Sequence, residues 1–338
     1  MVKEDVIRPR PPRTVDPDKL ERLRQWSRRK PVIALMGEFS SGKSTLLNLL
    51  VGQDMMPVKV TATHLPPVWL RYGSAEPYRI DRKGRRHPVD LNRLSDVPVE
   101  DTRVIRVFSQ ADILGRCDLI DMPGISDPNL AAQDHLDILA AASGVIWCTH
   151  AAQAWRESER AMWAEMPARL RQNSILLVTR ADKLRSEEDV AKIEARLARE
   201  TNGLFAARIF ASLKTALAAQ RADNPLAWEA SGAAELVTTL ESILRRVSRR
   251  REQLLSRYLA ENGTADPQLA EGGAIAVEDN ADASDPAAGT VSTPLSPDQD
   301  AARRALLSDL RDVLSHHAAA LGSVTLADLA SLLAELDR

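Results

Sequence analysis

The sequence predicts an α/β fold in which helices flank a mainly parallel β-sheet, with short helical extensions at both ends. The first observation is an apolar run at 31–36, followed by a glycine-containing loop and a second apolar segment at 46–51. Such a run is typical of a buried parallel strand, and the segment after the loop is typical of a helix. The second observation is that strand-like runs recur at 68–72, 117–121, 144–148 and 174–178, with a last strand and loop at 208–214. The third is that Ala and Leu are abundant and only 4% of residues are aromatic, so we expect helices around the sheet.

Composition sets the size and the chemical class of the chain. Its 338 residues suit one large domain with an appendage or two small domains, and 44% hydrophobic residues support a core. The net charge of −2 argues neither for nor against a nucleic-acid partner. There is no apolar run of about 18 residues and the N-terminus is polar and Arg-rich, so we expect neither a membrane-spanning helix nor a signal peptide. Cys117 and Cys148 lie in apolar runs, which predicts buried, reduced thiols rather than a disulfide.

One motif organises the chain. The stretch Gly37-Glu38-Phe39-Ser40-Ser41-Gly42-Lys43-Ser44-Thr45 fits G-x4-G-K-S/T, the phosphate-binding loop (P-loop) of nucleoside triphosphatases. Backbone N–H groups of such a loop and the positive end of the following helix surround phosphate oxygens. We expect Lys43 to reach the β- and γ-phosphates and the Ser44 hydroxyl to ligate Mg²⁺. The alternative is a glycine-bearing turn without a ligand, and the strand–loop–helix context favours the P-loop.

A second motif follows about 80 residues later, where Asp121-Met122-Pro123-Gly124 ends a predicted strand. An Asp at the carboxyl end of a strand is placed to hold the water shell of Mg²⁺, and a Gly after it lets a backbone N–H approach the γ-phosphate. The intervening segment 53–67 has no clear period and predicts a loop, where a nucleotide triphosphatase places its Mg²⁺-sensing threonine. Either Thr61 or Thr63 suits that role.

A third motif, Thr179-Arg180-Ala181-Asp182, matches N/T-K/R-x-D after the strand-like run at 174–178. Guanine presents two neighbouring N–H donors that one carboxylate accepts together, so Asp182 would select GTP over ATP. The alternative is an exposed Asp in a turn at the start of a helix, and the two other motifs favour guanine. Backbone N–H groups near Ser212 are placed to contact the guanine carbonyl.

The remaining segments predict peripheral elements. Asp16-Pro17 begins a helix through about Arg29, which either packs against the domain edge or pairs with a later helix as half of a hinge. A hairpin at 78–89 has a basic turn at 82–86, which is most simply a solvated tip. The helix expected at 232–260 carries an arginine face. No Lys or Arg occurs between Arg257 and Arg303, and this predicts an acidic disordered linker before two short helices.

Together these motifs resemble those of the dynamin-like GTPases, especially the bacterial members. The P-loop extended to G-E-F-S-S-G-K-S-T-L-L-N, the segment V-T-A-T-H-L-P-P-V (60–68), L-I-D-M-P-G and T-R-A-D carry the resemblance, which covers about residues 31–215. It implies that Thr63 is the Mg²⁺ threonine, and that Arg180 covers the guanine base where lysine is usual. Combined with the composition of the flanking segments, the resemblance gives the expected domain organisation: a basic segment and helix (1–30), the dynamin-like GTPase domain (31–231), a long arginine-rich helix (232–260), an acidic disordered linker (261–298) and a C-terminal helical pair (299–338).

The resemblance implies a mechanism as well. Small GTPases orient the attacking water with a glutamine after D-x-x-G, whereas this chain has Ile125 there. Dynamin-like enzymes instead use the loop, the switch threonine and a monovalent cation, completed when two GTPase domains meet face to face. Ser40 matches the loop serine of that arrangement, so the implied catalytic residues are Ser40, Lys43 and Thr63. The alternative for Ser40 is plain loop geometry.

The leading hypothesis is therefore a Mg²⁺-dependent dynamin-like GTPase that forms a homodimer or associates with a related GTPase. A full stalk cannot be built from these helices, so we expect membrane association through a partner, in the cytoplasm or at the inner face of the membrane. The first alternative is a translation- or ribosome-assembly-linked GTPase switch, which usually adds a basic RNA-binding domain; none is indicated, so no nucleic acid is expected. The second is a nucleotide-gated interaction module with little turnover, which Ile125 permits.

Overall fold

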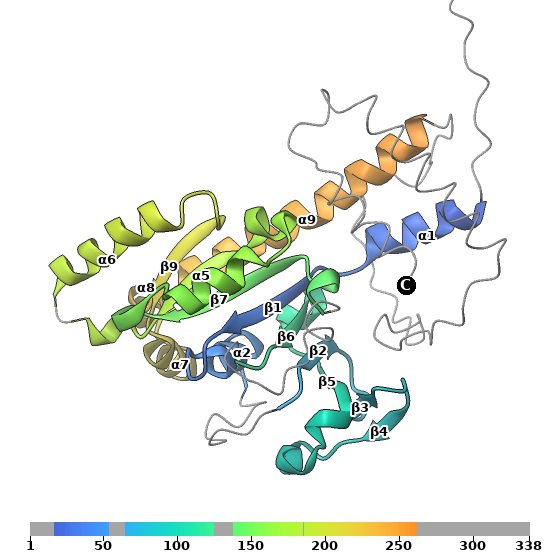
Figure 1. Cartoon of the computed structure of the whole chain (residues 1–338), viewed down its shortest axis with the longest axis horizontal. Helices are drawn as coiled ribbons and strands as arrows, with labels where there is room; N and C mark the ends of the chain where they lie inside the picture. Colours follow the sequence, from blue (N-terminus) through green and yellow to red (C-terminus); the bar gives the residue numbers. More distant parts are fainter. Residues whose placement is uncertain (1–16, 54–64, 125–137, 185, 262–338) are drawn as a thin grey trace, which may run out of the picture. The chain divides into compact units, whose positions relative to one another are not determined.

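The computed structural model of the chain describes residues 17–53, 65–124, 138–184 and 186–261 (Figure 1). Several predictions lie outside these residues. They concern Thr61, Thr63, Ile125, the acidic linker and the C-terminal helical pair, and they stay predictions.

In the described residues, nine strands form one sheet in the order β4-β3-β5-β2-β6-β1-β7-β8-β9 (Figure 1). Their bounds are β1 (Val32–Gly37), β2 (Val68–Tyr72), β3 (Tyr78–Asp81), β4 (Arg86–Pro88), β5 (Thr102–Ser109), β6 (Asp118–Asp121), β7 (Gly144–His150), β8 (Ile175–Thr179) and β9 (Ala207–Ala211). The five strands from β6 to β9 in this order are all parallel. Strand β2 is antiparallel to β6 and parallel to β5, and the β3–β4 hairpin adds antiparallel pairs at the edge. The predicted mainly parallel sheet is confirmed.

Helices cover both faces of this sheet. The α-helices of the described residues, whether or not they lie on the sheet, are α1 (Pro17–Arg28), α2 (Lys43–Val51), α3 (Asp112–Arg116), α5 (Glu157–Ala164), α6 (Glu187–Glu200), α7 (Leu213–Arg221), α8 (Pro225–Ala230) and α9 (Ala233–Glu261). Short 3-10 helices are η1 (Leu91–Asp96), η2 (Val99–Asp101), η3 (Ala151–Gln153), η4 (Ala168–Asn173) and η5 (Ala181–Lys183). Helix α2 packs with α3 and α7, whereas α5 and α6 lie on the other side of the central strands (Figure 1).

Alternation along the central strands fills both layers. In β1, Val32, Ala34 and Met36 belong to the core cluster beneath α5 and α6, so the intervening Ile33 and Leu35 face the opposite layer. An aromatic group anchors the first layer: the rings of Trp147, Trp155, Trp163 and Phe205 pack with centroid distances from 4.2 to 6.5 Å. This rigid layer lies directly under the segment that follows β7.

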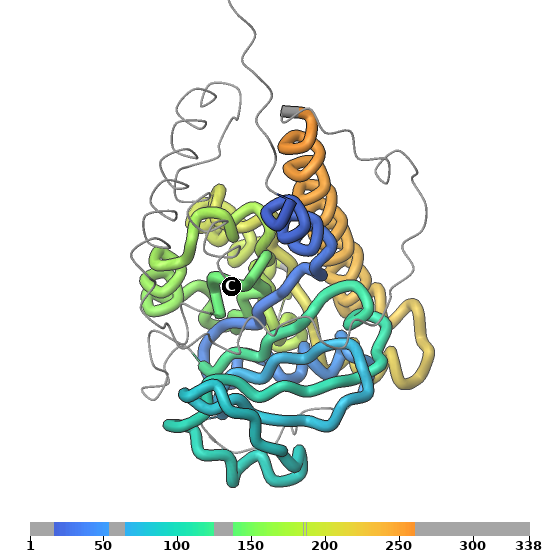
Figure 2. Tube along the Cα trace, turned by 90° about the vertical axis from the view of Figure 1, so that its right-hand side faces the viewer, coloured from blue at the N-terminus to red at the C-terminus, as the bar shows by residue number. Residues whose placement is uncertain are grey.

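Two compact units divide the chain, one holding residues 30–245 with the sheet and one holding α1 with α9 from Arg246 onward. In the second unit, α1 lies beside the end of α9 (Figure 2). The guanidinium of Arg251 is 5.4 Å from the ring centroid of the buried Trp26 and donates a hydrogen bond of 2.7 Å to the carbonyl of Arg29. The predicted pairing of the N-terminal helix with a later helix is therefore observed, and its hinge role stays a prediction. Among the helices that the structure describes, none has the length and apolarity needed to cross a membrane.

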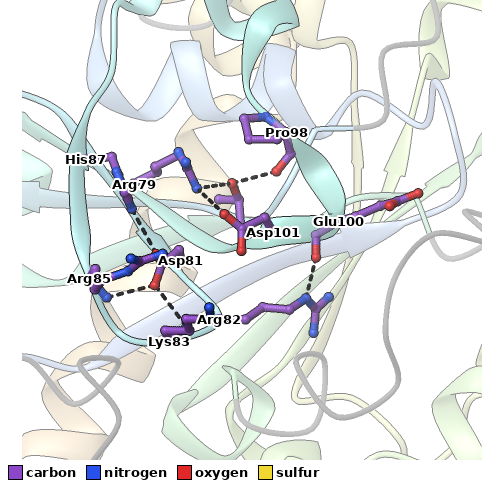
Figure 3. A network of polar contacts seen from close by, with 10 residues as sticks. Arg79, Asp81, Arg82, Lys83, Arg85, His87, Pro98, Glu100 and Asp101 are labelled. Carbon is purple, nitrogen blue, oxygen red and sulfur yellow. Dashed lines mark hydrogen bonds and ion pairs between the residues drawn. The ribbon is translucent and has the colours of Figure 1, made fainter.

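The hairpin of β3 and β4 is organised by a buried carboxylate (Figure 3). Asp81 is fully buried, and it accepts hydrogen bonds from the backbone N–H of Lys83 (2.9 Å), the backbone N–H of Arg85 (2.8 Å) and the Arg85 guanidinium (2.8 Å). Its Oδ2 also lies 2.9 Å from Nε2 of His87. These contacts, led by the one with His87, hold the pKa of Asp81 well below its usual range. The basic turn is thus fixed from within while its cationic side chains stay exposed.

Candidate functional site

The segment between β1 and α2 forms a loop that only particular residues permit. Gly37, Ser40 and Gly42 have positive φ angles of 137°, 56° and 99°. A Cβ atom at Gly37 would lie 2.1 Å from the carbonyl oxygen of Cys148, which belongs to the neighbouring strand β7. A side chain there would displace the strand, so glycine is required for the close approach. The predicted P-loop therefore has the strand, loop and helix that the motif needs.

Lys43 begins α2 and points back into the loop. Its side chain is buried, and Nζ donates to the carbonyls of Gly37 (3.1 Å) and Glu38 (2.8 Å). Burial lowers the pKa of Lys43, and the nearby carboxylate of Asp121 acts in the opposite direction. The ammonium group is thus held inside the loop, where its charge is little screened by water.

Asp121, at the end of β6, faces the start of α2. Its Oδ2 accepts a hydrogen bond of 3.0 Å from the Ser44 hydroxyl, while its Oδ1 is buried with no partner among the described residues. Burial raises the pKa of Asp121 to about 6, opposed by the charge of Lys43 and the bond from Ser44. One carboxylate and one hydroxyl beside an unpartnered buried oxygen fit the oxygen-ligand chemistry of Mg²⁺. Close by, a Cβ atom at Gly124 would lie 3.1 Å from the backbone nitrogen of Phe39, so the second motif touches the first.

The third motif is hydrogen-bonded to the same loop. The Thr179 hydroxyl, buried at the end of β8, donates to the carbonyls of Ser41 (2.8 Å) and Thr149 (3.1 Å). Arg180 adopts a left-handed conformation with φ of 57°, and its Nη2 donates to the Ser40 carbonyl at 3.0 Å. The side chain of Asp182 in η5 is 35% exposed and forms an ion pair of 3.8 Å with Lys183. Asp182 is therefore accessible at the surface rather than tied into the core.

Ser212 lies at the end of β9 and caps α7. Its hydroxyl accepts from the backbone N–H of Thr215 (3.4 Å), and its own backbone N–H donates to the Ser231 carbonyl (2.9 Å). In this structure the hydroxyl, the backbone N–H and the backbone carbonyl of Ser212 are all used locally, the carbonyl by the N–H of Ala216. Its proposed contact with a base stays a prediction.

Polar residues outside the three motifs also lie beside the loop, and the sequence did not predict their place there. The Glu38 carboxylate contacts Arg156 and Ser158 at the start of α5, and Glu159 is buried beneath them. His150, at the end of β7, has a buried Nδ1 with no partner in the described part of the chain. One signal in the sequence could have indicated them: polar residues cluster directly after the strand at 144–148. Because the carboxyl ends of parallel strands share one edge of a sheet, residues that follow this strand are expected near the P-loop.

Residues 33–201, which are 169 of the 338 residues, match the family model of the dynamin family. The chain belongs to the dynamin family. It is 30% identical over 162 residues to Dynamin-like protein 2 of Campylobacter jejuni, covering 46% of this chain and 27% of that protein. It is 32% identical over 122 residues to the isoniazid-induced protein IniC of Mycobacterium tuberculosis, covering 33% of this chain and 25% of that protein. The chain thus spans about a quarter of the length of these relatives.

A solved structure agrees at the level of the fold. This dynamin-family chain superposes on a subunit of an oligomerised bacterial dynamin pair with a TM-score of 0.50 and 23% identity, covering 72% of this chain and 39% of that one. That pair is described as a mechanism for long-range sensing and tethering of membranes. At this identity the likeness establishes the shared fold alone.

Proposed function

We propose that this dynamin-family protein hydrolyses GTP to GDP and phosphate at the carboxyl edge of its sheet, and that it needs Mg²⁺. One observation carries the proposal: three motifs far apart in the sequence converge on one loop. Ser44 lies 3.0 Å from Asp121, and the Thr179 hydroxyl lies 2.8 Å from the Ser41 carbonyl. This convergence supports a common ligand with phosphates at one end and a base at the other.

Each residue then has a defined task. The backbone N–H groups of 37–45 and the Lys43 ammonium bind the phosphates, and Gly124 brings a further N–H to the γ-phosphate. Ser44 and Thr63 would ligate Mg²⁺ directly and Asp121 through water; the ion, when bound, supplies positive charge to the phosphates. Thr179, Arg180, Asp182 and the amides near Ser212 hold the guanine base. Ser40, Lys43 and Thr63 orient the attacking water, and a monovalent cation, when bound, would supply further positive charge.

The proposal includes association between GTPase domains, as a homodimer or with a related GTPase. The Ile125 side chain has no polar atom with which to orient water, so a second domain would complete the site. Phe39, within the P-loop itself, has a side chain that is 61% exposed, and an exposed aromatic ring is the kind of residue that protein interfaces are enriched in.

We also propose a cytoplasmic location, with contact to the inner face of the membrane made through a partner and no role for nucleic acid. The exposed arginines of α9, including Arg245, Arg249 and Arg250, support attraction to an anionic surface. Membrane remodelling by this chain is not part of the proposal, because it matches only about a quarter of each relative.

The test is GTP turnover measured against protein concentration, with and without anionic liposomes, and with ATP as the comparison nucleotide. We expect Mg²⁺-dependent GTP hydrolysis whose specific rate rises with concentration, and no hydrolysis of ATP. Lys43→Ala should abolish nucleotide binding, and Thr63→Ala should spare binding but stop turnover. Tight GTP binding with a flat, near-zero rate would indicate a nucleotide-gated module instead. Equal use of ATP would refute the guanine assignment.

A further inference from the structure

The proposed phosphate loop contains an acidic residue, and the structure turns that acid away from the loop. Glu38 is the second residue of the motif, where its charge would repel a triphosphate. Its carboxylate instead accepts a hydrogen bond of 3.1 Å from Nη1 of Arg156 and a short one from the Ser158 hydroxyl. We call Glu38, Arg156 and Ser158 the acid clamp. It joins the loop to a turn that lies 118 residues later in the chain.

The turn that carries the clamp is itself firmly anchored. Arg156 is the residue before α5, and its backbone N–H donates to Oε2 of Glu159 at 2.9 Å. Glu159 is 2% exposed, and it also accepts from the indole of Trp147 (3.0 Å) and the hydroxyl of Thr149 (2.8 Å), both in β7. A buried carboxylate with three donors fixes the backbone of Arg156 relative to the sheet. The Arg156 guanidinium therefore contacts Glu38 from a backbone position that these hydrogen bonds hold in place.

The positive charge of Arg156 also acts on His150, which lies beside the loop. His150, at the end of β7, has its pKa lowered first by burial and then by the positive charges of Arg180 and Arg156, with Glu38 acting in the opposite direction. Arg180 itself donates to the Ser40 carbonyl. Arg156 thus belongs to a group of cations around the loop, and Glu38 is the acid that offsets one of them.

We propose that Arg156 is a positioning residue for the nucleotide site: it neutralises Glu38 and holds that carboxylate against α5, so that the loop offers a net positive charge to the triphosphate. This inference rests on the proposed GTP site and adds a residue that the three motifs do not contain. The proposed effect is electrostatic. The Glu38 and Arg156 side chains are 19% and 45% exposed, so the pair is only partly buried. Partly exposed ion pairs contribute little to folding stability, so the clamp should act on ligand affinity instead.

Removing each charge of the pair in turn tests this proposal. In Arg156→Gln the Glu38 carboxylate loses its cationic partner, and GTP affinity should fall by about tenfold, which corresponds to about 1.4 kcal/mol. GDP carries less charge, so its affinity should fall less. In Glu38→Gln the repelling charge is removed and GTP should bind more tightly than to the wild type. The double variant restores the charge balance and should recover most of the affinity lost in Arg156→Gln.

The experiment is a fluorescent-nucleotide titration of the full chain and these three variants, with the thermal unfolding midpoint measured in parallel. Arg160→Gln is the matched control and should bind GTP like the wild type, since Arg160 lies in the first turns of α5, close in sequence to Arg156, but pairs with Glu157 and Glu200. Raised salt should shrink the Arg156→Gln effect, because the pair is partly exposed.

The outcomes separate the possibilities. If wild-type protein binds no GTP, the proposed function fails, whatever the variants do. If wild type binds GTP and Arg156→Gln binds it equally well, or if Glu38→Gln fails to rescue Arg156→Gln, the clamp has no electrostatic role and this inference is wrong. Should Arg156→Gln not fold, Arg156→Lys and Glu38→Gln decide the matter: the first should stay within a few-fold of wild type and the second should tighten binding, and a weakening in Glu38→Gln would overturn the inference.

Discussion

Replacing Gly37 by Ala tests the close approach of the P-loop to strand β7. The new Cβ would lie 2.1 Å from the carbonyl oxygen of Cys148 and 2.8 Å from the hydroxyl oxygen of Ser41. Gly37 also has a φ of 137°, a conformation that side-chain-bearing residues rarely adopt. Both effects act on the residue that ends β1 and opens the loop.

The expected cost is the sum of two contributions. Strained backbone conformations cost about 1–3 kcal/mol, and inserting a carbon into packed structure costs about 1–3 kcal/mol. The contact is with backbone on a central strand, which cannot rotate away as a side chain would, so we expect about 4 kcal/mol in total. Gly52→Ala is the matched control: Gly52 has a φ of 75° and a Cβ atom added there would meet no atom within 4 Å, so only the conformational cost of about 1–2 kcal/mol remains.

Urea unfolding of both variants measures this difference directly. We expect the free energy of unfolding of Gly37→Ala to lie about 2–3 kcal/mol below that of Gly52→Ala. Gly37→Ala should also lose nucleotide affinity, whereas Gly52→Ala, at the far end of α2, should keep it. Equal destabilisation of the two variants would refute the steric reasoning. Retained nucleotide binding in a folded Gly37→Ala would refute the role given to the loop.

Three other predictions concern separate parts of the chain. Asp182→Asn should weaken GTP binding and favour xanthine nucleotides in a competition assay, and unchanged GTP preference would remove Asp182 from the base site. Asp81 has a pKa held below its usual range by His87 and Arg85, so it stabilises the fold fully above about pH 4 and less as the pH falls further. Thermal unfolding of Asp81→Asn should therefore show a lower midpoint near neutral pH and a smaller loss in acid than the wild type; identical acid profiles would contradict this. Burial raises the pKa of both Cys117 and Cys148 to about 12, so a thiol reagent at about pH 8 should label neither in the folded protein and both after denaturation.

The central strands could be predicted because burial on both faces leaves a continuous apolar run. Val68–Tyr72 was predicted with the bounds that the structure has. Strand β5, by contrast, was not predicted, because charged residues interrupt it. Arg106 lies in its middle and is fully buried, with its guanidinium 3.8 Å from the ring centroid of Trp69 on β2. The contact depends on a residue of the neighbouring strand, so the local sequence pattern of β5 does not predict that Arg106 is buried.

The candidate site divides in the same way. The placement of motif residues such as Lys43, at the start of α2, and Asp121, at the end of β6, was predictable because each belongs to a short local motif. The contact between Glu38 and Arg156 joins residues 118 apart, and neither residue signals its partner. Glu159 looks in the sequence like an ordinary acid in the first turn of a helix, whereas the fold buries it under Trp147. The burial of Glu159 arises only when α5 packs on β7, so the local sequence does not predict it.

Three neighbours hold the loop, each at a different residue. Strand β7 approaches Gly37, the Thr179 hydroxyl of β8 bonds the Ser41 carbonyl, and α5 holds Glu38. A loop fixed in this way before ligand binding avoids the entropic cost of being ordered on association. It also means that a change in any neighbour moves the loop without touching the ligand. Nucleotide affinity in this protein should therefore be sensitive to the segment between β7 and α5, which contains none of the three motifs.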